Sequence, residues 1–188
     1  IPSVAGLIDR ANVSADATNA NEMTNAIERF TSEYELYVQD VASKRVGTDL
    51  DSAQSRVQGV IGAVDTRDGL SGIEMATAFK YGSTTEYAGA ATTGTKIYRD
   101  TKYPVNYDTL KKVVENYTKT SSATFEPKQS DCHFYYSPQC GLVVCAVDGA
   151  TDDALDDFVI SGKDAKGRSL ETYDVEWIDL TDGGATVA

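Results

Sequence analysis

The sequence predicts an α+β fold in which a long N-terminal α-helix packs on a C-terminal antiparallel β-sheet, with a helix and loop insert between them. Three observations support this prediction. Apolar residues recur at helical spacing through residues 1–46, short helical patterns alternate with glycine- and threonine-rich loops in residues 47–128, and residues 129–188 carry strand patterns separated by turn sequences. With 188 residues, 41% of them hydrophobic, the chain is long enough for one domain with a real core.

The long helix is predicted from a stripe of apolar residues at steps of three and four. Smaller apolar residues continue the pattern upstream, and Gly47 after two basic residues is a typical helix end. Such a helix is roughly 60 Å long, about twice the diameter of the remaining domain, so we expect about its first 15 to 20 residues to protrude. Polar residues between the stripe positions, including Asp16 and Glu33, are expected to face water. The residues expected to pack under the sheet are Ala20, Met23, Ile27, Phe30, Tyr34 and Tyr37.

The insert is predicted to hold three short helices. The first spans residues 52–64 and is weakened by two glycines, and the second opens at a capping box and spans about residues 71–80. A loop rich in glycine, threonine and alanine follows at residues 82–94. The third helix begins at residue 106 or 107 and carries its apolar residues on one side.

The sheet is predicted as an antiparallel meander of four or five strands. Two hairpins are expected, one around the turn at residues 137–140 and one around residues 164–167. A closing strand then leads into a polar tail that begins at Thr181. The predicted strands are residues 132–136, 142–147, 158–161, 168–173 and 175–180.

The cysteines suggest one internal disulfide. Three are present, Cys132, Cys140 and Cys145, so at least one thiol is left over. A hairpin centred on Pro138 and Gln139 places Cys132 opposite Cys145 on one side of the ladder, in a geometry that favours a bond between them. Buried, unpaired thiols in a reducing setting are an equally good interpretation.

Two metal sites are compatible with the composition. His133, the only histidine, makes a zinc site with the three cysteines arithmetically available, but the ligand spacing is atypical for zinc. A patch of carboxylates offers the hard oxygen ligands that calcium prefers, although the same residues after Thr151 read more simply as the start of a helix. The candidate calcium ligands are Asp152, Asp153, Asp156 and Asp157.

The sequence carries little that indicates catalysis. It contains no nucleophile elbow, phosphate-binding loop or dinucleotide fingerprint, and His133 and Cys132 are expected on opposite faces of one strand. The prediction is therefore a protein that is not an enzyme and needs no cofactor. A formal net charge of -12 repels phosphate backbones and anionic headgroups, which disfavours nucleic acids and membrane surfaces as partners.

The N-terminal sequence resembles a type IV pilin that starts just after its apolar N-terminal segment. The resemblance is carried by Ile1-Pro2-Ser3 and by the amphipathic stretch ANVSADATNANEMTNAIERF, and it extends to about Tyr37. The stretch from Tyr135 to Val144 is similar to the sheet hairpin of pilins from Gram-positive bacteria. The order of elements, a long helix, a variable insert and a C-terminal sheet, also agrees with the family.

The resemblance implies an extracellular pilus subunit for adhesion or motility, with a precursor held in the plasma membrane only by the missing segment. Its partners would be copies of itself or related pilins in a helical filament. A head-to-tail contact that does not close produces such a filament. A pseudopilin of a secretion system and a surface binding module on a helical stalk are the alternatives. The residues expected to contact other subunits are Val4, Leu7, Ile8 and Ala11.

Overall fold

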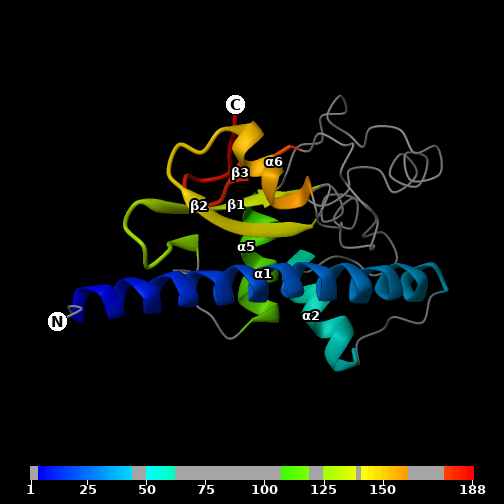
Figure 1. Cartoon of the computed structure of the whole chain (residues 1–188). Helices are drawn as coiled ribbons and strands as arrows, with labels where there is room; N and C mark the ends of the chain where they lie inside the picture. The colour runs from blue at the N-terminus through cyan, green and yellow to red at the C-terminus, as the bar shows by residue number, and fades with distance from the viewer. Residues whose placement is uncertain (1–3, 44–49, 62–106, 119–124, 139–140, 161–175) are drawn as a thin grey trace.

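The computed structural model has an α+β fold, with a long N-terminal helix against a small antiparallel sheet (Figure 1). It describes residues 4–43, 50–61, 107–118, 125–138, 141–160 and 176–188. The helices are α1 (Val4–Ala42), α2 (Ser52–Ile61), α5 (Tyr107–Tyr117) and α6 (Asp152–Ile160), and the strands are β1 (Cys132–Ser137), β2 (Leu142–Val147), β3 (Ile178–Asp179) and β4 (Ala185–Thr186). In the described part of the chain, no helix combines the length and apolarity needed to cross a membrane.

Helix α1 runs along one face of the sheet and extends past it at the N-terminal end (Figure 1). Its predicted stripe is buried from Ala20 to Tyr37, in one core with residues of α2, α5, β1, β2 and β3. Helices α2 and α5 also contact α1. The core side chains on α1 are Ala20, Met23, Ala26, Ile27, Phe30, Tyr34 and Tyr37.

Asp16 does not face water, contrary to the expectation from the sequence. Its residue is 0% exposed, and its carboxylate accepts hydrogen bonds from the backbone N–H groups of Lys128 and Gln129 at 2.8 and 3.0 Å. The side-chain amide of Gln129 donates a third bond at 2.9 Å. Asp16 lies four residues before Ala20 and therefore on the same face of the helix, so the stripe ends in a carboxylate that holds the loop before β1.

Glu33 is likewise mostly buried, again contrary to expectation. It accepts two hydrogen bonds from the guanidinium of Arg56 on α2 and one from the hydroxyl of Tyr117 on α5. Burial alone would raise the pKa of Glu33, but the bonds from Arg56 and Tyr117 and the Arg56 charge outweigh it and lower the pKa. One carboxylate on α1 thus joins both short helices to it.

The sheet has the strand order β2-β1-β3-β4, and all its pairs are antiparallel. Strand β2 is at an edge, and its Val143 N–H donates to the hydroxyl of Thr24 on α1 at 3.0 Å. That hydroxyl in turn donates to the carbonyl of Ala20 at 2.9 Å. The helix therefore contacts the sheet through a polar bond as well as through its apolar stripe.

The register of the β1–β2 hairpin differs from the prediction by two residues. Cys132 is opposite Val147 and Cys145 is opposite Phe134, so the expected direct pairing of the two cysteines is wrong. The reason is the turn. The last pair is Ser137 with Leu142, and the chain between them ends in Gly141, whose φ of 64° favours glycine. A shift of two keeps each side chain on its predicted face.

The C-terminal part departs further from the prediction. Residues 158–160 belong to helix α6 and are not a strand, because the helix that begins at Asp152 continues through them. Strand β3 has only two residues, and the expected polar tail forms a turn with positive φ at Gly183 and Gly184 that leads into β4. The predicted second insert helix, the loop at residues 82–94 and the strand at residues 168–173 lie outside the described residues.

The two faces of the sheet are covered differently. Phe134, Tyr136 and Val143 face α1 and belong to its core. Tyr135 lies on the opposite face, and helix α6 crosses the sheet on the side away from α1 (Figure 1). Titratable polar residues that could bind a ligand gather on this second face.

Candidate functional site

The exposed apolar end of α1 is the first candidate site. Leu7 and Ile8 are 61% and 53% exposed, Ala11 is also exposed, and the side chain of Val4 lies outside the described ones. Among the described side chains of α1, the first buried one is Asp16. About three helical turns therefore precede the first buried contact with the domain.

The sequence pattern suggested that this end continues the buried stripe, but it does not. The apolar pattern steps by five residues from Ala15 to Ala20, instead of by three or four. Ala20 therefore lies more than a third of a turn around the helix axis from Ala15. Leu7 precedes Asp16 by nine residues, or about two and a half turns, so the two lie on opposite sides of α1. Counting the phase along the helix would have revealed this from the sequence.

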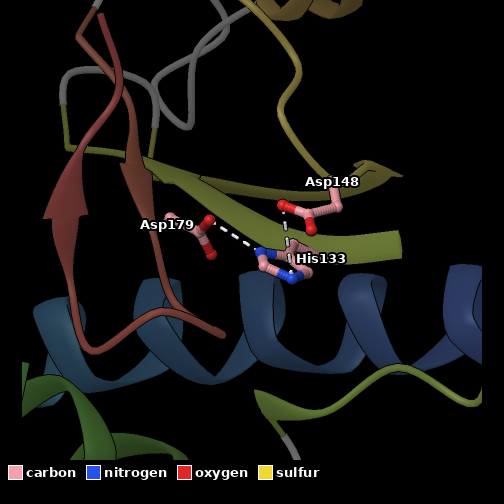
Figure 2. Close-up of side chains that lie close together, drawn as sticks. All are labelled: His133, Asp148 and Asp179. Atoms are coloured by element: carbon pink, nitrogen blue, oxygen red, sulfur yellow. Dashed lines mark hydrogen bonds and ion pairs between the residues drawn. The ribbon is translucent and has the colours of Figure 1, made fainter. Parts of the chain in front are cut away.

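A second candidate site lies on the sheet face away from α1. His133 of β1 is bracketed by Asp179 of β3 and by Asp148, which follows β2 (Figure 2). Its Nδ1 is 2.7 Å from Asp179 Oδ2, and its Nε2 is 3.5 Å from Asp148 Oδ1. The side chains of His133 and Asp179 are 21% and 13% exposed, whereas that of Asp148 is 64% exposed. The imidazole is thus held between two carboxylates.

Sequence reasoning missed this cluster because it needs the strand order. His133 is one pleat from Tyr135, which pairs with Asp179, and it pairs with Ala146, two residues before Asp148. All three therefore fall on one face of neighbouring strands. The pairing of β1 with β3 joins residues more than 40 positions apart, which no local pattern indicates.

The predicted calcium ligands are brought together only in part. Carboxylate oxygens of Asp152, Asp153 and Asp156 lie within 4.8 Å of one another at the start of α6, and Asp157 is exposed and outside this group. Asp156 accepts a hydrogen bond from the indole of Trp177 at 2.9 Å. Helix α6 does begin here, with Asp152 and Asp153 in its first turn, as its simpler interpretation predicted.

Cys132 and Cys145 are free thiols on the face that carries the α1 core, placed as diagonal neighbours. Burial, the Asp16 carboxylate and then Cys132 raise the pKa of Cys145 to about 12. Burial and the neighbouring Asp131 also raise the pKa of Cys132. A disulfide between them stays a prediction, and Cys140 lies outside the described residues. His133 is on the opposite face, so the described residues do not join it with these thiols.

Comparison of the chain with protein-family models, with curated proteins and with solved structures returned no significant match.

Proposed function

We propose that the chain is a structural subunit of an extracellular type IV pilus-like filament and that it assembles through the N-terminal end of α1. The observation that carries the proposal is the run of about three helical turns before Asp16 in which no described side chain is buried, with Leu7 and Ile8 more than half exposed. A helix end whose large apolar side chains stay exposed in its own domain gains stability by packing against another molecule.

The rest of the domain supports this role. The C-terminal part of α1 is fixed to the domain by a continuous core, by Asp16 and by the Glu33 network, so the exposed end projects from a well-anchored support. Identical subunits that contact one another head to tail without closing form a helical filament. The resemblance of the N-terminal sequence to type IV pilins agrees with that geometry and supplies the proposed use in adhesion or motility.

The proposal is tested by charge substitution at the helix end. Ile8→Glu should leave the thermal melting of the chain unchanged but abolish its incorporation into surface filaments of the producing cells, measured by immunogold labelling and by sedimentation of sheared filaments. The matched control is Phe158→Glu, because Phe158 is 49% exposed and belongs to α6, which lies on the side of the sheet away from α1 (Figure 1). Normal filaments with Ile8→Glu, or equal loss with both variants, would contradict the proposal.

The same experiment separates the alternatives. Loss of secretion of other proteins with no change in surface filaments would instead indicate a pseudopilin. A chain that stays monomeric on the cell surface and binds a ligand through its sheet would indicate a stalked binding module. Either result overturns the filament proposal.

A further inference from the structure

The cluster of His133, Asp148 and Asp179 has the parts of a transition-metal site. It is independent of the proposed assembly surface, because it lies on the sheet face away from α1 (Figures 1 and 2). Three neighbouring segments in the order β2, β1 and β3 each supply one side chain to it. Residues on paired strands hold their side chains at fixed separations, so the cluster is built on the most regular part of the fold.

Asp179 is positioned to orient the imidazole rather than to bind an ion. Its Oδ1 accepts hydrogen bonds from the backbone N–H groups of Thr181 and Asp182, each at 3.0 Å. Its Oδ2 faces His133 Nδ1 at 2.7 Å. A carboxylate held by the backbone in this way favours the tautomer with the proton on Nδ1, which leaves the lone pair of Nε2 directed away from it.

The separation of Nε2 from Asp148 suits two ligands of one ion. At 3.5 Å from Asp148 Oδ1, Nε2 is beyond the distance of an ordinary hydrogen bond. Two ligands bound at about 2.1 Å in a tetrahedral site are roughly 3.4 Å apart. Asp148 is also the most exposed member of the cluster and can adjust to an ion, while its backbone N–H is fixed to the Asp131 carbonyl at 2.8 Å.

An open pocket of about 370 Å³ adjoins the two carboxylates. Asp148 and Asp179 line it together with Tyr135, Asp182 and residues 149–151 and 185–188. The pocket gives a hydrated cation access to the Asp148 carboxylate. The acidic lining and the net charge of -12 favour a cation over an anion.

We propose that this cluster binds a divalent ion of the zinc class through His133 Nε2 and Asp148, with Asp179 as the positioning residue. An imidazole nitrogen combined with a carboxylate is a ligand set for zinc, cobalt or nickel, whereas calcium and magnesium prefer oxygen alone. With only two protein ligands, one of them the largely exposed Asp148, the ion is exchangeable.

The experiment uses the whole chain with its three cysteines replaced by alanine, so that thiols cannot bind the metal, and titrates it with zinc chloride. Because the chain has one histidine, long-range nitrogen–proton NMR spectra report its ring without ambiguity. Zinc should shift the Nε2 resonance strongly and leave Nδ1 protonated. Unchanged imidazole resonances at millimolar zinc would overturn the proposal, as would metal bound through Nδ1.

Variants test each role by calorimetric titration with zinc. His133→Ala and Asp148→Asn should abolish the binding, and Asp148→Asn should not disturb folding because its side chain is largely exposed. Asp179→Asn should weaken binding by about tenfold, the effect of losing a partner that orients a ligating histidine, and should also perturb the tautomer in the NMR spectrum. Asp157→Asn on α6 is the control and should change nothing. Full affinity in Asp148→Asn would overturn the assignment.

Discussion

The two halves of α1 share one helix and differ in what their side chains contact. From Asp16 to Tyr37 the helix buries a stripe against α2, α5 and the sheet, whereas none of the described side chains before Asp16 is buried. The apolar side of the first part also points in another direction, because the pattern shifts between Ala15 and Ala20. The contrast shows that an apolar helix face joins a domain core only where it points toward the rest of the domain.

The largest expected effect is on the buried half. Phe30 is 1% exposed and contacts the rings of Tyr34 and Tyr117, so Phe30→Ala should lower the free energy of unfolding by about 3–5 kcal/mol. Ile8→Ala should change it by less than about 0.5 kcal/mol, as expected of an exposed position. Urea denaturation of both variants measures the difference. Similar losses in both would show that the two halves are not distinct.

The boundary between the halves is tested at Asp16. Asp16→Ala leaves the N–H groups of Lys128 and Gln129 without their carboxylate and should destabilise the domain by about 1–3 kcal/mol. Asp9→Ala is the control, because Asp9 is an exposed aspartate on the same helix, seven residues earlier. An unchanged midpoint of denaturation in Asp16→Ala would show that Asp16 does not anchor the helix and that the anchored half begins nearer Ala20.

A pH-dependent effect is expected at Glu33. Because its pKa is lowered in the folded state, its contribution is present above the pKa of an unfolded glutamate and is lost as the pH falls through the lowered value. Glu33→Gln should therefore cost about 1 kcal/mol at pH 7, and this difference should fade below about pH 4. Thermal melts of both proteins from pH 7 to pH 3 measure it. A constant difference over that range would contradict the role of the charge.

The smallest effect concerns Cys145, beneath the anchored half. With a pKa of about 12, its thiol is almost entirely protonated at neutral pH, so alkylation in the native state should be slow and should accelerate on unfolding. Asp16→Asn removes one cause of the raised pKa and should speed the native reaction slightly. Peptide mass spectrometry after timed iodoacetamide treatment measures the rate. Rapid alkylation of the native protein would contradict a raised pKa of the Cys145 thiol.

Local patterns predicted the parts of the fold that depend on local sequence. The α+β fold with its long helix and antiparallel sheet, the helix from Tyr107 and the strands of the first hairpin follow from apolar periodicity and turn residues. Periodicity does not report polar side chains that are buried by distant partners. The sequence pattern therefore predicts that Asp16 and Glu33 face water. In the structure Asp16 binds the loop at residues 128–129, and Glu33 binds residues of two other helices.

The sheet site was less accessible to prediction than the helix end. The exposed apolar residues of α1 are visible in the sequence, and their direction around the helix axis follows from their spacing along the chain. The cluster around His133 depends on β3 pairing with β1 and on the register of β2, both set by long-range packing. A turn ending in a left-handed glycine shifted that register by two residues, which the turn sequence alone did not indicate.

The most direct test of the account is site-specific photo-crosslinking in cells that produce the protein. A photoreactive amino acid at position 8 should give ladders of crosslinked copies of the chain, because Ile8 is on the end proposed to contact other subunits. The same group at position 158 should give none, and at position 13 it reports whether the other side of the helix end also takes part. The absence of crosslinks between copies from position 8 would contradict assembly through this end of α1.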